Sequence, residues 1–306
     1  MNDIKKLEGK VIAVTGAGRG IGREIALLSA CHGAAVIVND LGGSASGIGV
    51  DQGPASEVVA EIRAAGGRAF ANTADVSQPD SAQTIIDDAV REFGHIDGVV
   101  NNAGFLRDVI FHKMQFKDFE DVVRVHLFGS FNVASAAAKF FRERGSGSIV
   151  NFVSASGLIG NYGQANYAAA KAGIAGLSNS IALDMKRFNV RSNCIMPFAW
   201  SRLIGTLPEN TPEERARLAK FQSMSPAKIA PMVSFLLSDA ATDISGQVFS
   251  VRNNEISVFN HMRPTRSIHR SDGWTAETIE THAIPALARN FPPLAVSADV
   301  FSWDPV

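Results

Sequence analysis

The chain has 306 residues, of which 46% are hydrophobic and 19% charged, and this composition argues against disorder and for a sizeable buried core. Its net charge of −1 gives no basic field for nucleic acid or an anionic membrane, and no apolar run reaches the roughly 20 residues of a membrane span. Two cysteines are too few for a secreted disulfide framework, and the first residues lack the pattern of a signal peptide, so we expect a cytoplasmic protein.

Short apolar runs alternate with segments of helical spacing. The apolar runs predict strands at 10–15, 34–39, 68–74, 98–101, 148–154, 189–196 and 247–251, and the helical spacing predicts helices at 20–32, 55–65, 81–93 and 116–141. Apolar strands that alternate with helices are typical of a parallel sheet covered on both faces, and right-handed crossovers make such a sheet doubly wound. We therefore predict a single α/β domain with a Rossmann-like, doubly wound parallel sheet.

Two stretches interrupt this alternation. Residues 41–54 form a long loop rich in Gly and Ser, and from Arg252 onward the alternation stops. The final stretch still carries the aromatic residues Trp274, Phe291, Phe301 and Trp303, so we expect it to pack near the mouth of an active site. The chain is accordingly divided into a catalytic domain, 1–251, and a C-terminal extension, 252–306, that packs on the core or on a neighbouring subunit.

The glycine-rich segment TGAGRGIG follows the first predicted strand and opens a helix. Gly16, Gly20 and Gly22 remove side chains where the turn is tight, where a pyrophosphate approaches the backbone and where the helix meets the sheet. The helix N-terminus offers free N–H groups and the positive end of its dipole to phosphates. In this strand–turn–helix context the pattern favours a dinucleotide site over a turn without a ligand.

Two charged residues bear on the choice of cofactor. Asp40 follows the second predicted strand, where a carboxylate accepts hydrogen bonds from the adenosine ribose and repels a 2′-phosphate. Arg19 acts in the opposite direction, because a guanidinium can hold that phosphate. We give Asp40 more weight, since its repulsion is direct and poorly screened in a crevice. We therefore expect NAD as the cofactor, with an NADP-dependent carbonyl reductase as the alternative.

Further cofactor contacts are expected where other strands end. Asp75 and Val76 end the third predicted strand, NNAG ends the fourth, and Pro197 follows the sixth. These positions share the carboxyl edge of the sheet, where ligands bind open α/β folds. The predicted cofactor-binding residues are Gly16, Arg19, Gly20, Ile21, Gly22, Asp40, Asp75, Val76, Asn102, Ala103, Gly104, Tyr167, Lys171 and Pro197. No metal is expected in the site.

Three residues form the predicted catalytic set. Tyr167 and Lys171 are four residues apart and so share one face of a helix, while Ser154 ends the fifth predicted strand. A neighbouring ammonium and a positive nicotinamide both favour the phenolate, so we expect the pKa of Tyr167 to fall from its ordinary value near 10. Ser154 would position the substrate oxygen, Tyr167 would transfer the proton, and Lys171 would hold the nicotinamide ribose.

Taken in order, these motifs resemble the short-chain dehydrogenase/reductase family over about residues 7–251. The matches are TGAGRGIG, Asp75, NNAG, Ser154 and Tyr167-x-x-x-Lys171. The resemblance implies the same fold, the same catalytic roles, and a homodimer or homotetramer. VNDLGG, RVHLFGSF and SASGLIGNYGQANYAAAK are also similar to the dehydrogenase part of peroxisomal multifunctional β-oxidation enzymes and to bacterial relatives in lipid and steroid breakdown.

The sequence departs from the family at two places. His126 stands where most members have Asn, a residue implicated in a water relay toward the lysine; His126 is either part of such a relay or a structural residue bonded to backbone, and we favour the second. After Pro197 the family commonly has Gly, whereas this chain has Phe198.

The predicted function is NAD(H)-dependent interconversion of a secondary alcohol and a ketone. Segments 158–162 and 199–221 are expected to line an apolar pocket that includes Trp200, Leu203, Ile204 and Phe221. This pocket favours a bulky apolar substrate over a sugar, and the resemblance implies a 3-hydroxyacyl-CoA or a steroid. The alternative from another class is a regulatory protein that binds the cofactor but turns over weakly, and the intact catalytic set argues against it.

Overall fold

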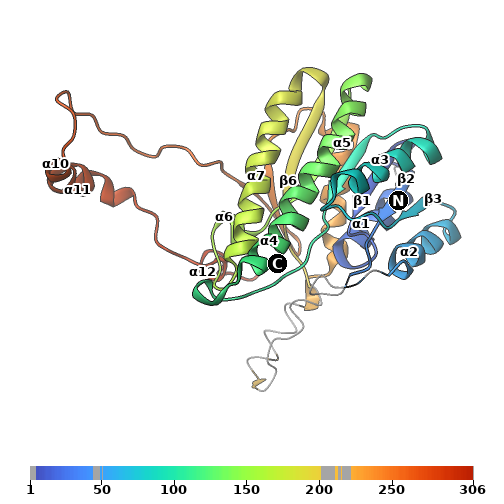
Figure 1. Ribbon diagram of the computed structural model, residues 1–306, viewed down its shortest axis with the longest axis horizontal. Helices are drawn as coiled ribbons and strands as arrows, with labels where there is room; N and C mark the ends of the chain where they lie inside the picture. Colours follow the sequence, from blue (N-terminus) through green and yellow to red (C-terminus); the bar gives the residue numbers. More distant parts are fainter. Residues whose placement is uncertain are drawn as a thin grey trace.

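The computed structural model describes residues 5–43, 49, 51–200, 211–212, 215 and 222–305. In this part of the chain a central eight-stranded sheet has the order β3-β2-β1-β4-β5-β6-β7-β8, with helices on both faces (Figure 1). Neighbouring strands are parallel except β7 and β8, which are antiparallel. The strands are β1 (Val11–Thr15), β2 (Ala35–Asn39), β3 (Arg68–Asn72), β4 (Gly98–Asn101), β5 (Gly147–Phe152), β6 (Val190–Phe198), β7 (Val248–Arg252) and β8 (Glu255–Phe259).

The helices connect successive strands and cover the sheet. The α-helices are α1 (Gly20–Cys31), α2 (Gly53–Ala64), α3 (Pro79–Phe93), α4 (Phe116–Val123), α5 (Gly129–Arg144), α6 (Ala155–Leu158), α7 (Ala165–Met185), α9 (Ala230–Leu237), α10 (Ala276–Thr278), α11 (Ile284–Leu287) and α12 (Ser297–Val300). Two π-helices are η2 (Arg124–Phe128) and η6 (Ile279–Ala283), and short 3₁₀ turns are η1 (Phe111–Lys113), η3 (Lys186–Phe188), η4 (Pro226–Lys228), η5 (Asp239–Ala241) and η7 (Ala288–Asn290).

The central strands are apolar throughout because both faces of the sheet are buried. In β1, Ile12 and Val14 pack into the core formed with α1, α2 and α9. Val11 and Ala13 point to the opposite side, into the core formed with α3 and α5. This alternation follows from the two-residue period of a strand, and it fixes the register of β1 between β2 and β4.

The predicted doubly wound fold is confirmed, although some of its elements differ from the prediction. First, β8 was not predicted, and it extends the sheet into the predicted extension beyond residue 251. Second, the single helix predicted at 116–141 is divided into α4, the π-helix η2 and α5. The expected pocket residues Leu203, Ile204 and Phe221 lie outside the described residues.

After β8 the chain leaves the body as a long arm and then returns to it (Figure 1). Residues 262–294, here called the arm, contain Trp274 and Phe291, which are 38% and 58% exposed. The returning segment packs on the core: the Phe301 ring lies 4.8 Å from that of Phe198, and Trp303 Nε1 donates to Glu255 at 3.1 Å. The extension therefore has two parts, a projecting arm and a docked end.

Candidate active site

The glycine-rich turn between β1 and α1 has no room for side chains. Gly16 has a φ of +64°, and a Cβ added to it would lie 2.8 Å from the Cα of Ala103. A Cβ on Gly22 would overlap the carbonyl oxygen of Gly16. The Asn102 side chain, at the end of the neighbouring strand β4, holds the turn in place. Its Nδ2 donates to the carbonyls of Thr15 at 3.0 Å and Gly16 at 3.1 Å. The predicted NNAG segment and the glycine-rich turn are thus one packed unit.

Asp40 lies against the same turn from the end of β2. Its Oδ2 accepts a hydrogen bond from the Gly18 N–H at 2.8 Å, and its Oδ1 accepts one from Gly42 at 2.7 Å. A Cβ on Gly18 would lie 2.8 Å from Asp40 Oδ2, so this approach requires glycine. Gly18 was not among the predicted site residues, although its place within the glycine-rich segment is a signal that could have identified it.

The N-terminus of α1 keeps its first N–H groups available. The residue before the helix, the exposed Arg19, forms no side-chain capping bond, and Gly20 has a φ of +55°. Uncapped N–H groups beside a turn without side chains suit a pyrophosphate, whose charge the helix dipole favours. Ile21, the next residue, packs partly buried against the core. These residues therefore fit a nicotinamide dinucleotide.

The remaining predicted cofactor residues also lie at the carboxyl edge of the sheet. Asp75 Oδ1 accepts from the Ser77 N–H at 2.9 Å, which shapes the turn after β3. Val76 is buried, and its carbonyl accepts from Asn132 Nδ2 at 2.9 Å. Pro197 lies near the end of β6, paired with Val251 in β7.

The three predicted catalytic residues come together at the ends of β5 and α7. Ser154 caps α6, its Oγ accepting from the Ser156 N–H at 3.2 Å, and it hydrogen-bonds the Tyr167 hydroxyl. The Lys171 ammonium is buried, 5.5 Å from the centre of the Tyr167 ring, and donates to the Phe152 carbonyl at 2.6 Å. A phenol, an aliphatic hydroxyl and a buried ammonium thus share one small region.

Burial controls the proton affinities in this cluster. Desolvation raises the pKa of Tyr167 to about 12, the Ser154 hydrogen bond opposes this rise, and the charge of Asp108 adds to it. Desolvation also lowers the pKa of Lys171 to about 7, against a smaller opposite effect of Cys194. For the protein alone, the expected lowering of the Tyr167 pKa is therefore wrong, because the phenol is buried and the ammonium is directed to the Phe152 carbonyl.

His126 lies in the π-helix η2, beside Tyr167. Its Nε2 donates to the Phe105 carbonyl at 2.8 Å, and its ring lies edge-on to the Tyr167 ring at 5.1 Å. A Cβ on Gly104 would overlap the imidazole, so the last residue of NNAG makes space for it. Burial, followed by the charge of Lys171, lowers the pKa of His126 to about 3, so the ring is neutral at physiological pH. The backbone bond matches the structural role that we favoured from the sequence.

We predict that His126 makes the fold sensitive to acid. Its folded-state pKa lies below the unfolded value of 6.5, so the unfolded chain binds more protons and the free energy of unfolding falls as pH drops from 6.5 toward 3. Between pH 7.5 and 5 this loss is about 2 kcal/mol. Chemical denaturation at both pH values should show a smaller loss in His126→Asn than in wild type or in His269→Asn, which changes an exposed histidine of the arm. Equal losses in all three proteins would contradict the assignment.

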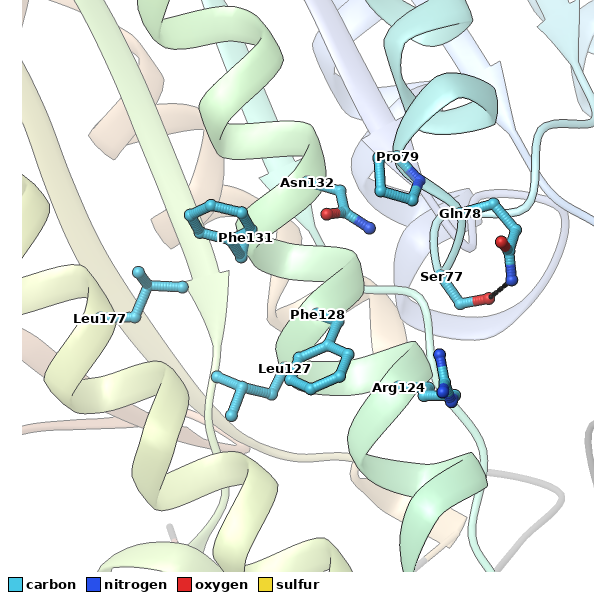
Figure 2. A pocket seen from close by; sticks show the side chains of 9 residues that line it. All are labelled: Ser77, Gln78, Pro79, Arg124, Leu127, Phe128, Phe131, Asn132 and Leu177. Atoms are coloured by element: carbon cyan, nitrogen blue, oxygen red, sulfur yellow. Dashed lines mark hydrogen bonds between the residues drawn. The ribbon is translucent and has the colours of Figure 1, made fainter.

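A groove of about 530 Å³ lies apart from this site. Figure 2 shows its lining, which comes from the start of α3, from η2 and α5, and from Leu177 of α7. Phe128 and Phe131 are 46% and 53% exposed there. None of Ser154, Tyr167 and Lys171 lines the groove, so it is a separate apolar surface feature.

Within the described ranges, no group of three or more His, Cys, Asp or Glu side chains is placed to hold a metal ion. No described helix has both the length and the apolar character needed to cross a membrane.

Comparison with known proteins agrees with this geometry. Residues 10–201 match the short chain dehydrogenase family. The chain is 45% identical over 238 residues to a putative short-chain type dehydrogenase/reductase of Mycobacterium tuberculosis, covering 78% of this chain and 80% of that protein. It is 35% identical over 311 residues to the hydroxyacyl-CoA dehydrogenase ChsB1 of the same species, covering 98% and 86%.

Two further likenesses extend the comparison. The peroxisomal multifunctional enzyme type 2 of Mus musculus is 43% identical over 247 residues, which is 80% of this chain but only 32% of that protein. A solved 7α-hydroxysteroid dehydrogenase in complex with NADH and 7-oxo glycochenodeoxycholic acid has a TM-score of 0.73 and 30% identity, covering 83% of this chain and 97% of that one. Both resemblances stated from the sequence are confirmed. The chain belongs to the short-chain dehydrogenase/reductase family and is an oxidoreductase.

Proposed function

We propose that the chain interconverts a secondary alcohol and a ketone with NAD, using Ser154, Tyr167 and Lys171 as catalytic residues. The observation that carries this proposal is the meeting of two hydroxyls and a buried ammonium at the sheet edge that also holds the glycine-rich turn. When bound, the nicotinamide supplies hydride transfer to or from the substrate carbon. The protein has to bind the dinucleotide, orient the substrate oxygen and move one proton.

The proposed roles follow from the chemistry of each side chain. Ser154 donates a hydrogen bond to the substrate oxygen and so positions it. Tyr167 gives a proton to that oxygen during reduction and takes it back during oxidation. With its pKa at about 12, Tyr167 is protonated at neutral pH, the state that reduction requires. Lys171 holds the nicotinamide ribose by donating hydrogen bonds from its ammonium.

The cofactor site is proposed to be selective for NAD through Asp40. Its carboxylate is already fixed by two backbone N–H groups, from Gly18 and Gly42, and each oxygen keeps a lone pair for a ribose hydroxyl. A 2′-phosphate at that place would meet a full negative charge. A structural relative solved with NADH supports the same choice.

The preference for NAD should reverse, or at least weaken, in Asp40→Asn. This change removes the charge and keeps an oxygen for one of the two backbone N–H groups. We expect the ratio of the NADP and NAD dissociation constants to fall by about tenfold, measured by titrating both cofactors. Asp97→Asn is the matched control, because Asp97 also accepts from a backbone N–H, that of Val11 at 2.7 Å, but precedes β4 at the opposite edge. A wild type that already prefers NADP would show that Arg19 outweighs Asp40.

For the substrate we propose a bulky apolar alcohol, either a 3-hydroxyacyl-CoA or a steroid. The relatives include a hydroxyacyl-CoA dehydrogenase and a hydroxysteroid dehydrogenase. Of the expected pocket residues, Leu158 and Ile159 pack partly buried against the core, whereas Tyr162 is 84% exposed. A panel of 3-hydroxydecanoyl-CoA, a 7α-hydroxysteroid and 1-phenylethanol, followed by NADH absorbance, tests the class. Turnover of none of the three would favour the cofactor-binding regulatory protein instead.

The assembly and location remain part of the same proposal. We propose a homodimer or homotetramer in the cytoplasm, and the half-exposed Phe128 and Phe131 rings support burial of that face in an assembly.

A further inference from the structure

A chain of hydrogen bonds lies behind Ser154, formed by residues outside the predicted catalytic set. Its centre is the buried hydroxyl of Ser156, two residues after Ser154. Ser156 Oγ lies 3.3 Å from Ser154 Oγ, 2.6 Å from Gln164 Oε1 and 2.9 Å from Asn161 Nδ2. Gln164 precedes α7, the helix that carries Tyr167 and Lys171. The same short loop therefore connects both parts of the catalytic set.

Two outer groups fix the direction of these bonds. Asp108 is a carboxylate that can only accept, and Gln164 Nε2 donates to it at 2.9 Å, so the Gln164 oxygen faces Ser156. On the other side, the backbone N–H of Ser297 can only donate; it donates to the Gly160 carbonyl at 3.1 Å and also reaches Asn161 Oδ1 at 3.4 Å. The Asn161 amide nitrogen consequently faces Ser156. The orientation of both amides follows from groups that have one hydrogen-bonding role each.

The bonding capacity of Ser156 is then completely used. Its single proton goes to Gln164, and its two lone pairs accept from Asn161 and from the Ser154 hydroxyl. Ser154 Oγ accepts from the Ser156 N–H, and the Tyr167 oxygen is a second acceptor within reach of the Ser154 proton, since a hydrogen bond donated by Ser154 lowers the pKa of the phenol. At 3.3 Å the Ser154–Ser156 bond is long and weak, so the Ser154 proton can move to a substrate oxygen at little cost.

We propose that Ser156 and Gln164 are positioning residues that orient the Ser154 hydroxyl for catalysis, with Asp108 and Asn161 fixing their direction. This inference rests on the proposed function, because it gives Ser154 the role of binding the substrate oxygen. It also connects the site to the C-terminal extension, since Ser297 is where the chain that returns from the arm bonds Asn161.

A double-mutant cycle tests whether Ser156 acts through Ser154. With the panel alcohol that wild type oxidises fastest, Ser156→Ala should lower kcat roughly 3–10-fold, the range for one hydrogen bond, and leave NADH affinity unchanged. In a Ser154→Ala background the same change should lower kcat no further. Ser178→Ala is the matched control, because it removes a buried hydroxyl on α7 that bonds Ser192 outside this network. An equal loss in both backgrounds would overturn the inference.

An exchange of partners tests the direction of the bonds. Gln164→Glu places a carboxylate against Asp108, so kcat should fall by at least as much as in Ser156→Ala. Asp108→Asn combined with Gln164→Glu restores a donor facing an acceptor and should return kcat to within about twofold of wild type. Gln83→Glu is the control, since Gln83 forms a similar bond with Asp87 on α3, at 3.0 Å. No recovery in the double variant would count against the inference.

These experiments distinguish failure of the proposed function from failure of the positioning role of Ser156 and Gln164. If Ser154→Ala leaves kcat unchanged, or wild type oxidises none of the three alcohols, the proposed function fails and the inference with it. If Ser154→Ala is costly but Ser156→Ala lowers kcat equally in both backgrounds, only the positioning role is lost.

Discussion

Tyr167→Phe should reduce kcat roughly 10²–10⁴-fold, the contribution expected of a positioned proton-transfer group. The phenylalanine ring fills the same space beside His126 and keeps the edge-on contact at 5.1 Å. The change removes only the hydroxyl that meets Ser154. NADH affinity and melting temperature should therefore remain close to wild type, and they are measured by fluorescence titration and thermal unfolding.

Comparing kcat with NADH affinity in this variant shows whether Tyr167 acts in proton transfer or in cofactor binding. A fall in kcat with NADH affinity intact assigns the proton to Tyr167. Activity above about one per cent of wild type would assign that role to another group, because general acid–base catalysis contributes at least a hundredfold. A large loss of NADH affinity would instead give the phenol a part in holding the cofactor.

Lys171→Met should lower kcat by about 10²-fold and, unlike the tyrosine change, weaken NADH binding. It should also alter how stability depends on pH. The folded-state pKa of Lys171 is about 7 and the unfolded value is 10.5, so the unfolded chain binds more protons between these values. The free energy of unfolding of wild type therefore rises with pH across this window, because the buried ammonium is released as a neutral amine.

The variant lacks this titrating group, so its stability should rise less from pH 7 to 10.5. Relative to wild type it should be most stable at pH 7 and below, and the advantage should shrink as the pH rises. Chemical denaturation at pH 7 and 9.5 measures both curves. Parallel curves would show that the wild-type ammonium is not destabilised by burial.

Much of the fold could be predicted because its local signals agree. The strands β1, β2, β4 and β5 are buried almost throughout, so each appears in the sequence as a short apolar run. The glycine-rich turn is equally visible, since close backbone packing leaves no choice of residue at Gly16 and Gly22. The order of Ser154, Tyr167 and Lys171 along the chain then placed the candidate site.

Other features depend on contacts between segments distant in sequence. In β8, Ile256 and Val258 are 59% and 65% exposed, so its apolar residues do not indicate a buried face. The pKa of Tyr167 depends on burial by surrounding elements, which the spacing to Lys171 does not report. The roles of Ser156 and Gln164 follow from bonds to Asp108 and to the returning C-terminal segment, which only the folded chain brings together.

The π-helix η2 places His126 beside Tyr167, whereas the helix α5 that follows it covers the sheet. A π turn contains one residue more than an α turn, and such turns occur as single insertions within otherwise regular helices. Loss of one residue from Arg124–Phe128 would join α4 and α5 into a continuous α-helix whose flanking turns still face the sheet. The His126 imidazole would then no longer pack beside Gly104 and Tyr167. A change of one residue in chain length would therefore remodel the candidate active site during evolution while the architecture persists.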